Sequence, residues 1–363
     1  TVAGANITIG VIGVLWFFSG DYKNKLNSIL SNKLAVASIV FFFVHVLGLL
    51  WTEDMDWGLH MVRKMWHFLL LLPILLTITK KGYIKYYISA FIAAITISEL
   101  ISYLVWFSIL PDPFLKASAY NPTPFMSHIS YNPFLAIAIY LILHELLFNR
   151  TIKKAAYFFY SFFAFTMTIN MFITGGRSGQ IMFFFMLVLL VFQCGIRNKI
   201  RAIFVSVAIV SVVGITAYNF SPIFNSRMNN MFTAVTNYQD HKNSSTGQRI
   251  TFALNSIEII KEHPLIGVGT GDFPAEYEKV SKENTPEVVL TVQPHNMYLL
   301  ELVQLGLVGL ISLLSIFYYQ IKFAMSSSVE FTKNFGVVLP CLFLVIMLGD
   351  SYLLGHFTTT LFV

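Results

Sequence analysis

Residues 200–219 read IRAIFVSVAIVSVVGITAYN, and this stretch decides which class of fold the chain adopts. Beyond Arg201 it contains no charged residue, and isoleucine, valine, alanine and phenylalanine fill most of its positions. About 20 apolar residues in a helix cross the hydrocarbon core of a bilayer, which is roughly 30 Å thick. We therefore predict that this stretch is a transmembrane helix.

Stretches of the same kind recur along the whole chain. Of its 363 residues, 56% are hydrophobic and 12% are charged, whereas soluble domains carry about 25% charged residues. Because a helix satisfies its own backbone hydrogen bonds in lipid, we predict an all-α polytopic membrane protein with about 11–12 transmembrane helices. The candidate spans are residues 5–18, 34–51, 58–78, 83–107, 133–148, 155–173, 179–194, 200–219, 296–321, 334–349 and 351–363.

Successive loops alternate between rich and poor in lysine and arginine. These residues gather in loops 19–33, 79–85, 149–154, 195–201 and 322–333, whereas loops 52–57, 108–132 and 174–179 contain only Lys116 and Arg177. Cationic loops stay in the cytoplasm, so the second set and segment 220–295 are expected outside. The alternation also places the start of the sequence outside and predicts one further helix before it. A net charge of +6 spread over short loops does not indicate a nucleic-acid-binding face.

The pattern divides the chain into three parts. N-terminal transmembrane helices are expected over 1–219, a large outer loop over 220–295, and C-terminal transmembrane helices over 296–363. An extramembrane connection as long as the second part is usually functional.

Within the outer loop we predict an amphipathic helix over 247–262. Ser245 and Gln248 fit a capping box at its start, and Pro264 ends it, since the residue before a proline avoids the α region. The helix is expected to lie on the membrane through its apolar stripe of Ile250, Leu254, Ile257 and Ile260.

Two arginines in the outer loops are candidates for binding an anion. Arg177 lies in the turn TGGRSG at residues 174–179, next to Ser178. Its glycines let a phosphate approach the backbone, and the next helix offers N-terminal N–H groups. Arg249 stands near the start of the predicted outer helix, where the helix dipole disfavours a cation. The alternatives are that Arg177 anchors a helix end by snorkelling and that Arg249 is an ordinary solvated arginine.

His295 lies where the outer loop re-enters the membrane, in QPHN at residues 293–296. A histidine at the membrane surface can accept a proton near neutral pH, and Asn296 can cap the next helix. The alternative is a polar interface residue without a chemical role.

Charged residues within apolar spans are costly and usually serve a purpose. Arg63 and Lys64 lie in the outer half of one span, and Arg63 is expected to point toward the same outer site. Glu99 and Asp350 lie in or near the outer halves of other spans and are candidate partners for these cations.

Metal binding has one weak candidate. Glu53, Asp54 and Asp56 form an acidic cluster that suits either a divalent cation with phosphate oxygens or a solvated loop, and we favour the solvated loop. The outer histidines lack ligand spacing such as HExxH. Cys194 and Cys341 are interpreted as small apolar fillers. We therefore expect neither a metal nor a cofactor.

Three stretches resemble, in order, the motifs of the O-antigen ligase and O-antigen polymerase superfamily of bacterial membrane glycosyltransferases. TGGRSG at 174–179 resembles its outward turn with an arginine. GQR at 247–249, with a helix and then HPLIGVG at 263–269, resembles its second segment. PHNMYL at 294–299, with Gly306 and Gly309, resembles its third. WTED at 51–54 with Arg63 resembles an early pattern of the family, and the resemblance covers roughly residues 34–350.

The resemblance implies a membrane glycosyltransferase of the GT-C type in the bacterial inner membrane, with its active site facing the periplasm. Such enzymes take a glycan from undecaprenyl diphosphate. A ligase passes it to the lipid A–core oligosaccharide without a metal, and a polymerase passes it to another lipid-linked repeat. Carried over residue by residue, it implies that Arg177 and Arg249 hold the diphosphate and that His295 is the essential histidine. Arg63 would add a third cation, and Ser178 and Asn296 would support the site.

The chemistry of transfer agrees with these roles. The departing diphosphate gains negative charge, which an arginine fork binds well. The acceptor hydroxyl loses a proton, so we predict that His295 is the base of an inverting transfer; a role in orienting the diphosphate is the alternative. We predict an O-antigen ligase. A polymerase and a protein oligosaccharyltransferase of the same superfamily are alternatives, as is a transporter of lipid-linked sugars, which would need polar groups near the bilayer midplane.

Overall fold

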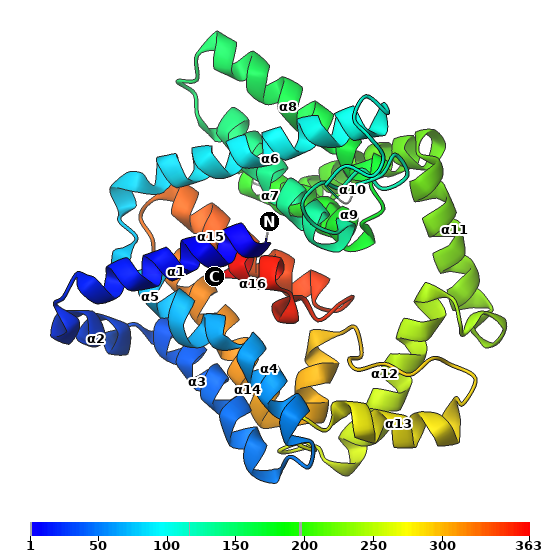
Figure 1. Ribbon diagram of the computed structural model, residues 1–363. Coiled ribbons are helices and arrows are strands. Elements are labelled where there is room, and N and C mark those ends of the chain that lie inside the picture. The colour runs from blue at the N-terminus through cyan, green and yellow to red at the C-terminus, as the bar shows by residue number, and fades with distance from the viewer. Residues whose placement is uncertain (1, 116, 196–197) are drawn as a thin grey trace. The chain divides into compact units, whose positions relative to one another are not determined.

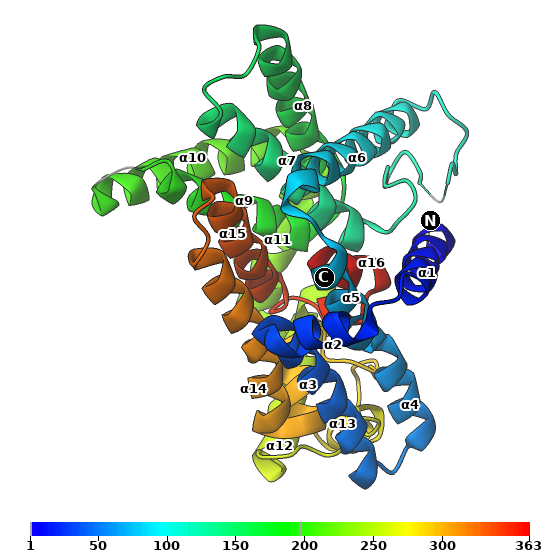
Figure 2. The same ribbon diagram turned by 90° about the vertical axis from the view of Figure 1, so that its left-hand side faces the viewer.

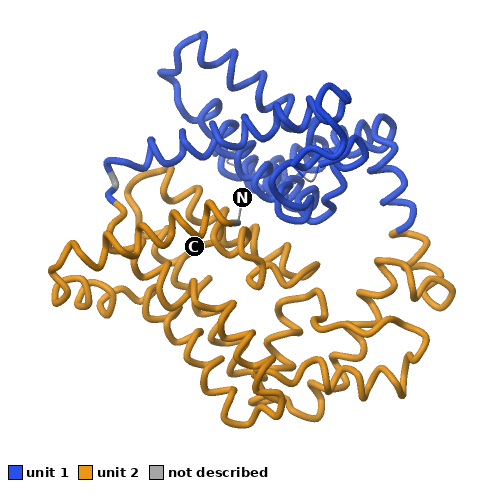
Figure 3. The backbone as a smooth tube through the Cα atoms, viewed as in Figure 1, with its two compact units in different colours: residues 1, 80–230 blue, residues 2–79, 231–363 orange. Residues whose placement is uncertain are grey.

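The computed structural model describes residues 2–115, 117–195 and 198–363, so Lys116 lies outside the described residues. Within that part of the chain the regular elements are all helices, which confirms the all-α prediction. The chain folds into two compact units (Figure 3). Unit 1 contains residues 80–230, and unit 2 contains residues 2–79 and 231–363.

Unit 1 is a helical bundle built around α7 (Figure 1). This helix packs against α6, α8 and α9, and Leu135, Ala136, Ile139 and Tyr140 on it are completely buried. The elements of the unit are η3 (Lys81–Tyr83), α6 (Ile84–Trp106), α7 (His128–Phe148), α8 (Lys154–Ile173), α9 (Arg177–Gln193), α10 (Lys199–Phe220) and the first part of α11 (Pro222–Thr236).

The outer helices of unit 1 have the opposite pattern of burial. α10 is as apolar as a protein core, with a mean hydropathy of 2.2, yet only 17% of that stretch is buried. It packs on α9 (Figure 2) and leaves Phe204, Val212 and Ile215 exposed. A surface this apolar suits lipid rather than water. The protein is therefore a multi-pass membrane protein.

Unit 2 is organised around α14 (Met297–Met325), which packs against α3, α12 and α15. Its N-terminal elements are α1 (Val2–Phe18), α2 (Tyr22–Ser31), α3 (Lys33–Leu47), η1 (Gly48–Trp51), α4 (Met55–Lys64), the π-helical turn η2 (His67–Leu71) and α5 (Leu72–Ile78). The others are η4 (Tyr238–His241), α12 (Ser245–Glu262), α13 (Phe273–Asn284), α15 (Glu330–Ile346), η5 (Tyr352–Leu354) and α16 (His356–Phe362).

Most predicted spans coincide with helices of suitable length. Among the described residues, 7 helices are long and apolar enough to cross a membrane: Lys33–Trp51, Met55–Ile78, Ile84–Trp106, His128–Phe148, Lys154–Ile173, Lys199–Phe220 and Met297–Met325. The expected spans 5–18, 179–194 and 334–349 correspond to α1, α9 and α15, of 17 residues each. A helix of that length is about 25 Å long, the lower limit for crossing a bilayer.

The expected span at 351–363 is wrong. These residues are not one continuous helix, because Tyr352–Leu354 form the turn η5 and α16 begins only at His356. The hydroxyl of Thr359 donates to the carbonyl of Leu353 at 2.8 Å, and the hydroxyl of Thr358 donates to that of Tyr352. These side-chain hydrogen bonds fold the segment back on the turn instead of extending it.

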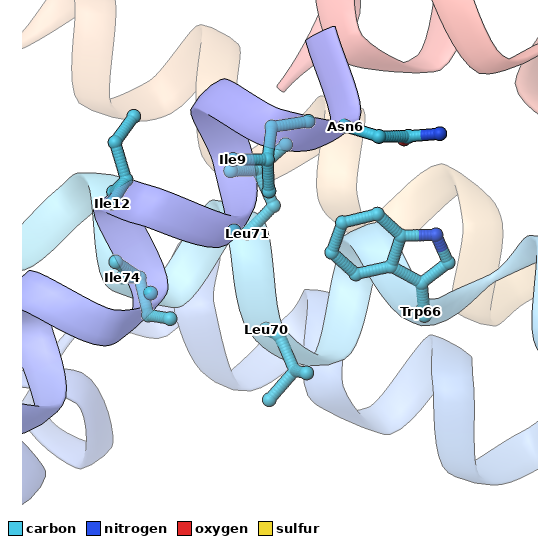
Figure 4. A pocket seen from close by; sticks show the side chains of 9 residues that line it. Asn6, Ile9, Ile12, Trp66, Leu70, Leu71 and Ile74 are labelled. Atoms are coloured by element: carbon cyan, nitrogen blue, oxygen red, sulfur yellow. The ribbon is translucent and has the colours of Figure 1, made fainter. Parts of the chain in front are cut away.

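A cavity of about 260 Å³ lies in unit 2 between α1 and the segment from α4 to α5 (Figure 4). Ile9, Ile12, Trp66, Leu70 and Ile74 line it. Asn6 and Trp66 are the lining residues that carry a polar side-chain atom. None of the predicted site residues borders the cavity, so the candidate chemistry lies elsewhere in the fold.

Candidate functional site

The point at which the outer loop enters α14 is bound to the end of α15. Asn296 caps α14, because its Oδ1 accepts hydrogen bonds from the N–H groups of Tyr298 at 2.9 Å and Leu299 at 3.1 Å; this confirms the predicted cap. Its Nδ2 donates to the carbonyl of Leu348 at 3.2 Å, and the N–H of Met297 donates to that of Met347 at 3.0 Å. The loop entry is thereby fixed against the segment that follows α15.

His295 lies immediately before this cap in an uncommon backbone conformation. Its φ angle is 51°, in the left-handed region that few residues other than glycine adopt, although histidine is among the more tolerant. Its Nδ1 lies 3.0 Å from Oδ1 of Asp350. The adjacent Asn296 cap and this hydrogen bond hold His295 in place at the cost of local backbone strain.

Asp350 is a charged acceptor for His295. Burial acts to raise the pKa of its carboxyl, but the hydrogen bond and charge of His295, the N–H of Ser351 at 2.8 Å and the charge of Arg249 outweigh it. The pKa of Asp350 therefore lies below its usual value. An ionised carboxylate only accepts hydrogen bonds, so Nδ1 of His295 is the donor, and Nε2 is the nitrogen that carries the lone pair whenever the ring is neutral.

Helix α12 brings two further side chains to this pair. Nη2 of Arg249 lies 4.0 Å from Oδ2 of Asp350, and about a third of the arginine side chain is exposed. One turn later, the buried ring of Phe252 stacks on the His295 ring, with the ring centroids 5.9 Å apart. The structure thus brings together His295 and Arg249, two of the predicted residues, with Asp350 between them.

The N-terminus of α12 differs in detail from the prediction. The hydroxyl of Ser244, not Ser245, caps it by accepting from the N–H of Gly247 at 3.1 Å. The predicted cap was thus one residue too late, and Gly247 has no side chain to complete the predicted capping box. Gly247 lies so close to the preceding turn that a Cβ there would be 2.0 Å from the carbonyl oxygen of His241. A side chain at position 247 would therefore clash with this turn.

The buried face of α12 is more polar than its exposed stripe. Thr251, Asn255 and Ser256 are buried, and Asn255 donates to the hydroxyl of Thr285 at 2.8 Å. In contrast, Leu254 is 50% exposed. The apolar stripe is thus free of unit 2 at this position, and its contact with the membrane stays a prediction.

The HPLIGVG segment after α12 packs against a break in α14. At Gly306 the backbone leaves the helical conformation, with φ 61°. There the N–H of Val268 donates to the carbonyl of Val303 at 2.9 Å, and the N–H of Leu307 donates to that of Pro264 at 3.0 Å. At Gly267 (φ 69°) a Cβ would lie 2.4 Å from the backbone of Gln304. The motif glycines therefore permit direct contact between two backbones.

Asp272, three residues after the HPLIGVG segment, binds the loop between α3 and α4. The carboxylate of Asp272 is buried and accepts hydrogen bonds from the N–H groups of Glu53 and Asp54, at 2.8 Å in the second case. Asp54 in turn caps α4 by accepting from the N–H of Trp57 at 2.9 Å. In the described part of the chain, no group of three acidic, histidine or cysteine side chains is placed to hold a metal.

Arg63 takes no part in the ion pairs among His295, Asp350 and Arg249. It is exposed on the last turn of α4 and forms no ion pair with any described residue. Asp350 pairs with His295 and Arg249 instead. Glu99 is completely buried in α6, and no described lysine or arginine forms an ion pair with it.

In unit 1, buried amide side chains hold the turn that precedes α9. Asn132 of α7 accepts from the hydroxyl of Thr174 at 2.8 Å and donates to the carbonyl of Gly176 at 3.2 Å. Gln180 donates to the carbonyl of Thr174 at 3.3 Å. Both amides are buried, so the turn conformation is firmly determined.

The glycines of this turn leave room for Asn132 of α7 to pack against the backbone. A Cβ on Gly179 would lie 2.2 Å from the side chain of Asn132, so α7 packs directly on the turn. Arg177 and Ser178 form the first turn of α9, half-buried. The glycines are thus required for packing, whereas the prediction ascribed them to phosphate access.

Phe252 was not among the predicted site residues, and Asp350 was predicted as a partner for Arg63 or Lys64 rather than for His295. Asp350 carries a sequence signal, because it is the only carboxylate between residue 331 and the end of the sequence, within an apolar stretch where charges are costly. Phe252 carries no such signal, because apolar residues are common in this chain.

Comparison with known proteins shows what this part of the chain is similar to. A family model described as O-antigen ligase matches residues 162–314, which include Arg177, Arg249 and His295. An uncharacterized protein of Haemophilus influenzae is 28% identical over 323 residues, covering 86% of this chain and 77% of that protein. The match over residues 162–314 confirms the resemblance to that superfamily predicted from the motifs.

Proposed function

We propose that this protein is an O-antigen ligase that transfers a glycan from undecaprenyl diphosphate to the lipid A–core oligosaccharide. Its active site would face the periplasm from the inner membrane. The family match and the multi-pass membrane fold support this class of enzyme. The observation that carries the mechanism is the hydrogen bond between His295 and the ionised Asp350.

His295 acts as the base in this proposal. Asp350 holds the proton on Nδ1, so Nε2 can take the proton of the acceptor hydroxyl. As it does, the acceptor oxygen bonds to the anomeric carbon of the donor sugar. The bond from that carbon to the phosphate oxygen breaks on the opposite face, and its electron pair leaves with the diphosphate. The configuration is inverted, and a base in this position contributes about 10²–10⁴-fold to the rate.

Arginines receive the departing charge. Arg249 lies beside His295 and donates no hydrogen bond to a described residue, so its N–H groups remain available for phosphate oxygens. The resemblance assigns Arg177 and Arg63 to the diphosphate as well, and we keep both roles as proposals. A fixed donor aimed at developing charge is worth about 3–4 kcal/mol when it is removed. The proposed reaction therefore proceeds without a metal, as in the ligase branch that the motifs resemble.

The test is transfer by the purified protein in the presence of EDTA, with lipid-linked glycan as donor and lipid A–core as acceptor. His295→Ala should reduce transfer by at least about 100-fold. His241→Ala, a change to a histidine of the same outer segment, should leave it intact. Full transfer by folded His295→Ala protein would refute the role of the base.

The same assay separates the alternatives within the superfamily. A glycan ladder without the core acceptor would identify a polymerase, and transfer to a peptide would identify a protein oligosaccharyltransferase. Movement of lipid-linked glycan across a vesicle membrane without any transfer would identify a transporter.

A further inference from the structure

A second arginine lies against the turn that carries Arg177. Arg227 belongs to α11 and packs over Gly175, where a Cβ would lie 2.6 Å from its Nη2. The guanidinium therefore fills space that is open only because residue 175 is glycine. His128, at the start of α7, lies within electrostatic range of both Arg227 and Arg177. Two arginines and the imidazole of His128 thus lie near one another at this end of unit 1.

Arg227 has no counter-ion in the part of the chain that the structure describes. It forms no ion pair and donates no hydrogen bond to a described residue, and partial burial lowers its pKa. The carboxylates of unit 1 are Glu99, Asp112 and Glu145. Asp112 accepts from the N–H of Ala119 and Glu145 from the side chain of Asn149. A partly desolvated guanidinium without a partner is unfavourable, which indicates that an anion completes the site.

A purely structural role would explain Arg227 if its guanidinium held the turn. However, Asn132 and Gln180 already bind the carbonyls of Gly176 and Thr174. The turn is thus fixed without hydrogen bonds from Arg227. The same buried amides keep the turn in place beneath the guanidinium, so the binding surface is formed before a ligand arrives.

We propose that Arg227 is a further binding residue, which together with Arg177 holds the diphosphate of the polyprenyl donor at the turn of residues 174–179. The inference rests on the proposed function, since it takes Arg177 to bind that diphosphate. A diphosphate ester presents oxygens for more than one guanidinium fork. A ligand of this charge supplies the counter-ion that Arg227 lacks.

Binding of undecaprenyl diphosphate to the purified full-length protein in nanodiscs tests the inference. Arg227→Gln should weaken binding by about 10- to 100-fold, as expected for charge-assisted hydrogen bonds. Gly175→Ala keeps the charge but displaces the guanidinium, and it should also weaken binding. Arg201→Gln, a change to an exposed arginine of the same unit, should bind as the unaltered protein does. Binding of uncharged undecaprenol should be the same for all variants.

The outcomes separate this inference from the proposed function. If Arg177→Gln weakens binding while Arg227→Gln and Gly175→Ala bind normally, the role of Arg227 is overturned and the proposed function stands. If the unaltered protein does not bind undecaprenyl diphosphate, both are overturned. Loss of undecaprenol binding together with diphosphate binding would show that Arg227 only supports the fold. If Arg227→Gln does not fold, the Gly175→Ala result decides.

Discussion

Replacing Asp350 by asparagine tests the arrangement around His295 most directly. Asparagine has nearly the same shape, so the change removes the charge and leaves the packing. The carboxylate now accepts from Nδ1 of His295 at 3.0 Å and lies 4.0 Å from Arg249. Once His295 has taken a proton, the ring is cationic, and the neutral amide can no longer stabilise that charge.

The size of the effect follows from the hydrogen bond that loses its charge. A hydrogen bond to a charged group contributes about 1.5–3 kcal/mol. Because about 1.4 kcal/mol corresponds to tenfold in rate, kcat should fall by about 10- to 150-fold. KM for the donor should not rise, since Asp350 is not a ligand of the diphosphate and Arg249 remains in place.

Steady-state transfer assays on Asp350→Asn measure both quantities, and Asp240→Asn provides a matched control at an exposed aspartate of η4. Residues that act as a unit have non-additive effects. A double variant of His295→Ala and Asp350→Asn should therefore be no slower than His295→Ala alone. A kcat for Asp350→Asn within about twofold of the unaltered protein would show that the carboxylate does not support the histidine.

Three further predictions concern stability. Gly267→Ala should lower the free energy of unfolding by about 2–5 kcal/mol, because residue 267 has φ 69° and its new Cβ would lie 2.4 Å from the α14 backbone. Thermal unfolding in detergent measures the loss. Gly214→Ala is the control and should show no such loss, because its Cβ would meet nothing closer than 4.0 Å. Ser244→Ala should cost about 1 kcal/mol and speed hydrogen exchange at the start of α12; unchanged exchange there would contradict the cap. The lowered pKa of Asp350 stabilises the fold above about pH 4, its unfolded value. The difference in unfolding free energy between the unaltered protein and Asp350→Asn should then shrink as the pH falls below that value; a difference that grows would contradict the lowered pKa.

Sequence predicts the long helices well because lipid imposes a simple length requirement on each of them. The stretch at 351–363 shows where that reasoning fails. Its composition is apolar, but Thr358 and Thr359 bond back to the preceding turn. Hydropathy does not register such local hydrogen bonds, so it cannot distinguish a short buried helix from a membrane span.

The candidate site was predictable only in part for a related reason. His295 and Arg249 belong to recognisable motifs, but the partner of His295 is 55 residues further along the chain. Which of the carboxylates approaches it depends on how α15 and the end of α12 pack on α14. The same holds for Arg227, because its importance depends on the glycine over which it lies.

The break at Gly306 links the outer loop to the membrane bundle more tightly than a covalent connection alone. An interrupted helix leaves carbonyl and amide groups without partners, and such groups cost several kcal/mol each in lipid. Here the backbone of residues 264–269 supplies those partners for Val303, Gln304, Leu307 and Val308. The loop cannot lift away as a mobile lid without opening the span beneath it. Motion during donor entry is therefore expected in other parts of the outer segment, with residues 264–269 as its stationary base.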